Sequence, residues 1–243
     1  MQTIIWEVIH GKALARKIWF PTANLHLENW IVEDWTYKIN IILDWVVFLW
    51  AGAYREKEEL FEAHIFDFDW DLYWKTIEIV ILEKIRENKK INSLEELKEL
   101  INWDIKYIKE NIFYGITFGT FDTFHPGHKY YLQEARKYCE KLITIVSTDL
   151  NVQKIKNHTP SDNQEKRKLN VQKSEFSDLV FIWEEENHLK YIIEYRPQII
   201  ILWYDQEWFI WELEKYLEKN NLKTEIIRIW DYKPEKYKSS KMK

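Results

Sequence analysis

Glycine is scarce in this chain. The 243 residues include only 5 Gly, whereas average usage near 7 % would supply roughly 17. Tryptophan occurs 14 times. Five of these residues follow Asn or Asp directly, in a dipeptide whose second residue is usually Gly because tight turns need positive φ there. The five pairs are Asn29-Trp30, Asp34-Trp35, Asp44-Trp45, Asp69-Trp70 and Asn102-Trp103.

Other absences restrict the class of protein. The single cysteine, Cys139, cannot form a disulfide within the chain, and no apolar run approaches the length of a membrane span. No charged and then apolar leader follows Met1. The net charge of -5 lacks the basic excess of a nucleic-acid or anionic-membrane binder. We therefore expect a cytoplasmic globular protein with no nucleic-acid or membrane partner, in which local sites can still bind small anions.

Apart from these absences, the sequence shows two patterns that meet near residue 110. Residues 1–109 carry short β-branched or alternating runs between turn signals, which predicts a small antiparallel β-barrel. Ser93 and Glu96 have capping-box spacing and predict a helix that covers this barrel. Residues 110–243 alternate between strand and helix patterns, which predicts a Rossmann-like parallel sheet with helices on both faces. The fold class is thus α+β followed by α/β, with strands expected at 36–43, 46–49, 61–66, 76–82, 113–118, 142–147, 179–182, 198–202 and 224–229.

Two segments of the first half resemble the riboflavin kinase family: HGKALARKIWFPTANL at residues 10–25 and FEAHIFDFDWDLYWK at residues 61–75. A kinase acting on an alcohol needs a hard cation on the ATP phosphates and a carboxylate that accepts the hydroxyl proton. The resemblance implies that Thr22 and Asn24 bind Mg²⁺, that Glu62 is the catalytic base toward riboflavin, and that Gly11 belongs to the nucleotide loop. Taken singly, the PTAN segment also fits a proline-initiated turn, and Glu62 fits a solvated strand residue.

The same family suggests an explanation for the tryptophans. Trp6, Trp19, Trp35, Trp70 and Trp74 fall on its glycine positions, and we expect the other Trp at turns or strand ends. Our hypothesis is that the source organism reads UGA as glycine, whereas this sequence was produced with a code that reads it as tryptophan. The abundance of Lys, Ile and Asn fits the AT-rich genome in which such reassignments arise. The alternative is a protein that is genuinely rich in tryptophan, in which Trp19 would crowd the Mg²⁺ loop.

A second signature, GTFDTFHPGH at residues 119–128, follows a predicted strand and opens a predicted helix. Free N–H groups at a helix start bind phosphate, and Gly127 allows a nucleotide to approach the backbone closely. His125 and His128 can donate hydrogen bonds to phosphate oxygens as charge develops on them. The segment resembles the cytidylyltransferase-like nucleotidyltransferases, and this resemblance adds a nucleotide-binding loop formed by Gly119, Thr120, Phe121 and Asp122.

Three further features concern the substrate of the second half. RPQIIILWYDQ at residues 196–206 resembles archaeal-type FAD synthases more than glycerol-3-phosphate cytidylyltransferases, which makes Asp205 a nucleotide-binding candidate. Lys154, with Lys156, is expected in a loop after Asn151, where it could bind the triphosphate. Ser239 and Ser240 resemble a late phosphate motif of the family. Solvated-surface roles remain open for Lys154 and for the serine pair.

The two halves share one metabolite, because a riboflavin kinase makes FMN and an FMN adenylyltransferase consumes it. We therefore predict a bifunctional enzyme of FAD biosynthesis that uses Mg²⁺ and ATP, with riboflavin, FMN and FAD as substrates and products. One alternative replaces the adenylyltransferase with a cytidylyltransferase for another phosphorylated small molecule. A second alternative is a catalytically weak flavin-binding protein whose sites are closed by tryptophan.

Overall fold

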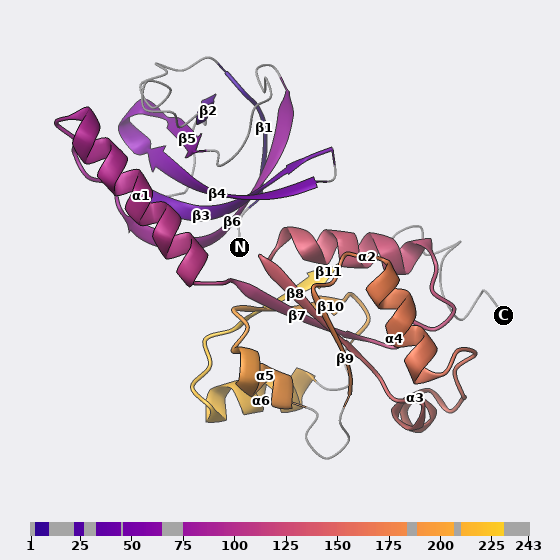
Figure 1. Ribbon diagram of the computed structural model, residues 1–243. Helices are drawn as coiled ribbons and strands as arrows, with labels where there is room; N and C mark the ends of the chain where they lie inside the picture. Colours follow the sequence, from indigo (N-terminus) through magenta and orange to yellow (C-terminus); the bar gives the residue numbers. More distant parts are fainter. Residues whose placement is uncertain are drawn as a thin grey trace. The chain divides into compact units, whose positions relative to one another are not determined.

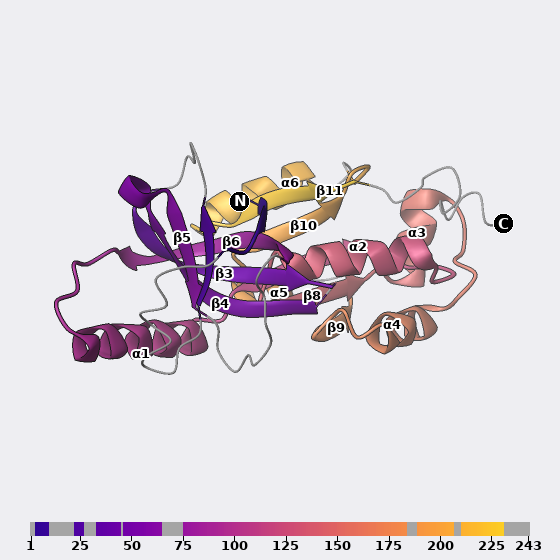
Figure 2. The same ribbon diagram turned by 90° about the horizontal axis from the view of Figure 1, so that it is seen from above.

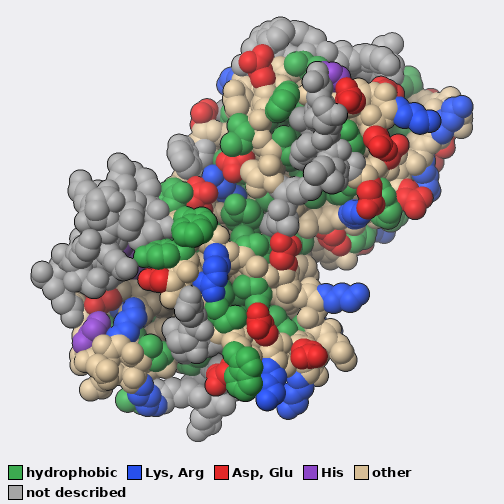
Figure 3. Space-filling view, turned by 180° about the vertical axis from the view of Figure 1, so that it is seen from behind, with side chains coloured by type: hydrophobic (Ala, Val, Ile, Leu, Met, Phe, Trp, Pro, Cys, Tyr) green, Lys and Arg blue, Asp and Glu red, His purple; other side chains and the backbone are tan. Residues whose placement is uncertain are grey.

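The computed structural model describes residues 3–9, 22–26, 33–44, 46–64, 75–183, 189–206 and 210–230. Residue contacts divide the chain into two compact units, Met1–Ile112 and Phe113–Lys243, which are considered separately. Within the described residues, no helix has the length and apolarity needed to cross a membrane. Basic and acidic side chains are interspersed on the face drawn in Figure 3.

The first unit is an antiparallel sheet that nearly closes into a barrel (Figure 1). Its strands lie in the order β1-β6-β3-β4-β5-β2. Beyond β1, the Ile9 N–H donates to the Asn24 carbonyl oxygen at 2.8 Å, so the two edges of the sheet approach each other. The predicted barrel is confirmed, with strands β1 (Thr3–Glu7), β2 (Thr22–His26), β3 (Trp35–Leu43), β4 (Val46–Arg55), β5 (Leu60–His64) and β6 (Thr76–Glu87).

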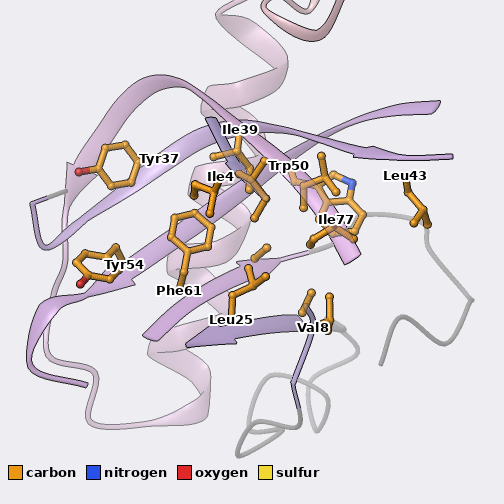
Figure 4. Close-up of a cluster of buried hydrophobic side chains, with 14 residues drawn as sticks. Ile4, Val8, Leu25, Tyr37, Ile39, Leu43, Trp50, Tyr54, Phe61 and Ile77 are labelled. Carbon is orange, nitrogen blue, oxygen red and sulfur yellow. The ribbon is translucent and has the colours of Figure 1, made fainter. Parts of the chain in front are cut away.

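The barrel core forms because alternate residues of each strand point inward. Tyr37, Ile39 and Ile41 follow this period along β3 and are all buried. Figure 4 shows Tyr37 and Ile39 in one cluster with Trp50 of β4 and Phe61 of β5. The alternate residues, which face outward, include polar side chains such as Lys38 and Asn40 and apolar ones such as Ile42 and Val80.

Helix α1 (Leu94–Glu110) covers part of this outer face. Its N-cap Ser93 accepts a hydrogen bond from the Glu96 N–H at 3.1 Å, as the capping pattern predicts. Arg86 on β6 holds Asp104 of the helix through two hydrogen bonds of 2.7 Å. The buried Lys38 ammonium donates to the Ile108 carbonyl oxygen near the end of the helix. These polar contacts fix the helix against β3 and β6.

The second unit is a parallel sheet with the strand order β11-β10-β7-β8-β9. Figure 2 shows the neighbouring strands β10 and β11 side by side. Helices α5 and α6 contribute to the core on one face, while α2 lies on the other face in Figure 1. The predicted Rossmann-like half is confirmed. Its elements are β7 (Tyr114–Gly119), α2 (Pro126–Lys137), β8 (Lys141–Val146), α3 (Asp149–Lys156), α4 (Gln164–Lys173), β9 (Leu179–Ile182), α5 (Lys190–Tyr195), β10 (Ile199–Trp203), α6 (Ile210–Lys219) and β11 (Glu225–Ile229).

Two expectations from the sequence are wrong. Lys154 and Lys156 do not lie in a loop, because Thr148 caps α3 through a hydrogen bond from the Asn151 N–H, and the helix extends to Lys156. Trp50 does not lie at a turn or strand end. It is in the interior of β4 and 2 % exposed, because its inward position allows the indole to fill the barrel core.

Other tryptophans also depart from the turn pattern. Trp103 lies inside α1, where it stacks on Tyr107 one turn away, and Trp211 lies in α6. Among the described residues, positive φ occurs at several non-glycine positions, but none of them is tryptophan. The turn residue Asp44 does have a φ of 48° between β3 and β4. The second residue of that turn, Trp45, lies outside the described residues, as do Trp19, Trp30, Trp70 and Trp74.

Candidate active sites

A row of side-chain positions crosses the outer face of the barrel from β6 to β2. The strand register pairs Arg86 with Thr36, Thr36 with Ala53, Ala53 with Glu62, and Glu62 with Asn24. Residues that pair directly across strands share a face of the sheet. The predicted base Glu62 therefore lies beside the predicted metal ligand Asn24, although 37 residues separate them in the chain.

A cavity of about 610 Å³ lies at this face, between the barrel and the start of α1. Its size is within the range of small-molecule sites, roughly 300–1,000 Å³. Glu62 of β5 and apolar residues of α1 both contribute to its wall. The lining combines apolar and charged groups: Asp34, Thr36, Ala53, Arg55, Lys57, Glu58, Glu62, Arg86, Asn88, Lys89, Lys90, Ile91, Asn92, Ser93, Leu94, Leu97, Leu100 and Ile101.

Asn24 lies on β2, next to Glu62 and on the side away from β4, and it is 2 % exposed. Its side-chain oxygen Oδ1 is buried, and no described residue donates a hydrogen bond to it. A buried amide oxygen without a partner is costly, so a donor or a cation is needed there. Thr22 is the first residue of the same strand. Gly11 lies outside the described residues.

In the second unit, the signature segment joins the end of β7 to the start of α2. His125 is the N-cap of α2, and its Nδ1 accepts a hydrogen bond from the Gly127 N–H at 3.1 Å. His128 Nδ1 accepts from the His125 N–H at 3.3 Å. A nitrogen that accepts carries no proton, so each neutral ring has its proton on Nε2. The motif thus supplies two oriented Nε2–H donors at a helix start.

The electrostatic surroundings keep the second of these rings neutral. Burial, followed by the effects of His125 and Lys156, holds the pKa of His128 well below its usual range. The two rings stack with centroids 3.8 Å apart, where two positive charges would repel each other. Burial also lowers the pKa of Lys156, against the opposing effects of the nearby Asp205 and Asp122. The charge of Lys156 therefore acts on His128, and the charges of Asp205 and Asp122 act on Lys156.

The predicted nucleotide residue Asp122 uses its carboxylate to anchor a loop. Its Oδ1 accepts from the Asp162 N–H at 2.9 Å and from the Thr123 N–H at 3.1 Å, and its Oδ2 accepts from the Ser161 N–H at 2.9 Å. Burial raises the pKa of Asp122, but these hydrogen bonds and the charge of Arg167 outweigh burial and lower it. The carboxylate joins the signature segment to the chain that precedes α4.

Arg167 is a residue of this region that the sequence did not reveal. It is 0 % exposed, and its guanidinium donates to Thr120 O at 2.6 Å, Ser147 O at 2.8 Å, Asp162 O at 3.0 Å and Asp149 Oδ1 at 2.7 Å. It thereby joins the ends of β7 and β8 to the chain before α4. In the sequence, the sign of this buried role is a basic residue on the inward side of a polar helix, and that is a weak signal.

The loop between β7 and α2 has an unusual backbone. Phe121 and Thr123 have φ values of 54° and 47°, a region that L-residues other than Asn and Asp rarely adopt. A Cβ at Gly119 would approach the Phe121 ring to 2.6 Å. Glycine at 119 is thus required by close packing, and the bonds from Arg167 and Asp122 hold the strained loop in place.

Trp203 ends β10 beside the two histidines. Its ring stacks on Tyr131 with centroids 3.8 Å apart and meets His128 edge-on at 5.8 Å. The indole therefore occupies space next to His128, one of the two histidines proposed to donate hydrogen bonds to phosphate. Lys154 lies in the last turn of α3, whereas Ser239 and Ser240 lie outside the described residues.

These features lie at the carboxyl ends of a parallel sheet, at the point where the strand order reverses between β7 and β10, which is where ligands bind in sheets of this kind. Residues 116–243 match the cytidylyltransferase-like family, and residues 3–112 match the riboflavin kinase family. FAD synthases from Aciduliprofundum boonei, Methanohalophilus mahii and Archaeoglobus fulgidus are 33 %, 38 % and 37 % identical over 114, 113 and 113 residues. The matches cover 47 %, 46 % and 46 % of this chain and 76 %, 77 % and 80 % of those proteins.

The chain belongs to the cytidylyltransferase-like family and carries a riboflavin kinase domain ahead of its nucleotidyltransferase domain. This confirms the predicted order of the domains and the prediction of a transferase of FAD biosynthesis.

Proposed function

We propose that the chain converts riboflavin to FMN in its first unit and FMN to FAD in its second, with ATP as the donor in both reactions. The position of Glu62 carries the kinase proposal, because this carboxylate lies between a ligand-sized cavity and the buried amide of Asn24. A riboflavin molecule in the cavity would present its ribityl 5'-hydroxyl to Glu62. The γ-phosphate of ATP would approach from the side of Asn24.

In the kinase reaction, Glu62 accepts the proton of the 5'-hydroxyl while the hydroxyl oxygen bonds to the γ-phosphorus and ADP leaves. General-base catalysis of this kind contributes about 10²- to 10⁴-fold. The apolar part of the cavity wall, formed by Leu94, Leu97 and Ile101, suits the flavin ring. Phosphoryl transfer depends mainly on such positioning and on neutralising phosphate charge.

Mg²⁺ fits the residues that we assign to it. The Oδ1 of Asn24 is buried without a donor among the described residues, and an amide oxygen is a suitable ligand for a hard cation. The described residues include no group of three His, Cys, Asp or Glu that could hold a metal by itself. Thr22 and Asn24 would therefore share the ion with ATP phosphates, whose negative charge it neutralises when bound.

In the transferase reaction, the phosphate oxygen of FMN attacks the α-phosphorus of ATP and pyrophosphate leaves. His125 and His128 donate from Nε2 to the phosphate oxygens as charge builds on them. Gly127 at the start of α2 admits the phosphates, and Lys154 and Asp205 complete the nucleotide site. The family resemblance adds Ser239 and Ser240, which lie outside the described residues. Gly119, Thr120, Phe121 and Asp122 act by shaping the loop that receives the nucleotide.

The test is direct. The protein is incubated with riboflavin, MgCl₂ and either ATP or CTP, and flavins are separated by chromatography. We expect FMN and then FAD with ATP. A cytidylyltransferase would consume CTP with a different phosphorylated acceptor and leave FMN unconverted, and a flavin-binding protein would return riboflavin unchanged. Either result would contradict the proposal.

A further inference from the structure

Arg55 forms a short charged contact with the proposed base Glu62. Its Nη2 lies 2.9 Å from Glu62 Oε2, and both side chains line the cavity. The Glu62 side chain is 20 % exposed and that of Arg55 is 43 % exposed. The ion pair is thus open to the site and accessible to solvent.

The strand register explains this contact. Arg55 is opposite Leu60 and Glu62 is opposite Ala53, so Arg55 and Glu62 are diagonal neighbours on the same face of β4 and β5. Diagonal neighbours are about 7–8 Å apart at the backbone, a distance that only long side chains can span. Glu58, in the turn between the strands, lies farther from the same guanidinium, at 3.7 Å from Nη1.

We propose that Arg55 is a positioning residue for the kinase reaction, holding Glu62 Oε2 so that Oε1 receives the proton of the substrate hydroxyl. This inference rests on the proposed function of Glu62. A glutamate has several rotatable bonds, and a planar guanidinium limits the directions that its carboxylate can take. A misplacement of about 1 Å at a catalytic group can cost around 10²-fold in rate.

Arg55 has no direct part in the covalent step. The O–H bond of the 5'-hydroxyl breaks, its proton goes to Glu62, the new O–P bond forms and ADP leaves. Arg55 keeps its proton throughout. Its removal should therefore lower kcat for FMN formation and leave the KM values for riboflavin and ATP largely unchanged. A guanidinium that bound a phosphate directly would instead change the KM for ATP.

The experiment measures FMN formation by wild type, Arg55→Ala, Arg55→Lys, Glu62→Gln and the double variant Arg55→Ala/Glu62→Gln. We expect Arg55→Ala to lose about 10²-fold in kcat. Arg55→Lys should lose less, because lysine keeps the positive charge but lacks the planar guanidinium that orients the carboxylate. Added guanidinium chloride at millimolar concentration should restore part of the activity of Arg55→Ala. The double variant should be no slower than Glu62→Gln, because Arg55 acts only through the carboxylate.

Lys106→Ala is the matched control, since Lys106 is 71 % exposed on α1 and forms only a weak surface pair with Glu110 at 3.9 Å. It should retain wild-type kcat. Conversion of added FMN to FAD by each variant shows that the second unit is intact, and circular dichroism shows that the barrel is folded.

The outcomes separate two failures. Wild-type kcat in Arg55→Ala, a change confined to KM, or a further loss in the double variant would overturn the positioning role while Glu62→Gln still showed Glu62 to be essential. Full FMN formation by Glu62→Gln would overturn the assignment of the base, and the role of Arg55 with it.

Discussion

Replacing Arg167 with methionine should destabilise the second unit strongly. The substitution keeps a long apolar stem but removes a fully buried guanidinium and its four hydrogen bonds. Three carbonyl oxygens would lose their donor, and each buried unsatisfied group costs about 1–3 kcal/mol. Asp149 is 37 % exposed and can be hydrated again, so its contribution should be small.

These contributions suggest a loss of about 3–5 kcal/mol, which is also the usual cost of breaking a buried charged network. Urea unfolding followed by tryptophan fluorescence and by far-UV circular dichroism measures the change, because the midpoint should fall at an unchanged slope. FMN adenylylation should fall as well, since the same bonds hold the loop of Phe121 and Thr123. Formation of FMN in the first unit should persist.

Lys166→Met on the same helix is the control. Its side chain is 62 % exposed, and exposed ion pairs contribute about 0–1 kcal/mol. A loss below about 1 kcal/mol in Arg167→Met, similar to that of the control, would refute the view that Arg167 joins the strand ends.

The remaining predictions concern the two reactions and the tryptophans. Glu62→Gln should abolish most FMN formation and leave conversion of added FMN to FAD intact; normal FMN production would contradict its role as the base. His128→Ala should slow adenylyl transfer by roughly 10²–10³-fold, so that FMN accumulates from riboflavin; undiminished FAD synthesis would remove this signature from the active site. Because the pKa of His128 is lowered in the folded protein, its contribution to stability is present above its unfolded pKa of about 6.5 and is lost as pH falls through the folded value. Urea titrations below pH 6.5 should therefore show a shallower pH dependence in His128→Gln than in wild type, and identical slopes would disprove the linkage. Replacing Trp30, Trp45 and Trp70 with Gly should raise soluble yield and kinase activity, because each follows Asn or Asp in a predicted turn, where a residue with a Cβ loses about 1–2 kcal/mol in a left-handed conformation. Mass spectrometry of the protein from its native cells should show glycine at these positions, and intact indoles there would end the recoding hypothesis.

Trp203 gives the recoding hypothesis a local test in the second unit. Trp203→Gly should free the space that its indole fills beside His128 and Tyr131, and tighten nucleotide binding. Trp211→Gly is a suitable comparison for binding, because Trp211 is 71 % exposed on α6. Isothermal titration with ATP should show the gain in the first variant alone.

The sequence was sufficient for features that depend on neighbouring residues. Strand alternation predicted the barrel, and the alternation of strand and helix predicted the parallel sheet, because burial imposes a period of 2 or 3.6 on successive side chains. The sequence also predicted the N-cap at Ser93, because Ser93 and Glu96 are three residues apart. The histidine signature was readable because strand end, turn and helix start are contiguous, so His125 and His128 meet within one helical turn.

Tertiary structure decided what depends on the register between distant strands. Glu62 and Asn24 are neighbours only because β5 pairs with β2, and Arg55 reaches Glu62 only because β4 pairs with β5 in one particular register. The cavity also requires α1 to lie against the outer face. Arg167 belongs to a helix of mostly polar residues, yet it is buried where two strand ends and a loop converge. Periodicity in one segment specifies which side of that segment is buried, whereas the partner it meets is set by the free energy of the whole sheet.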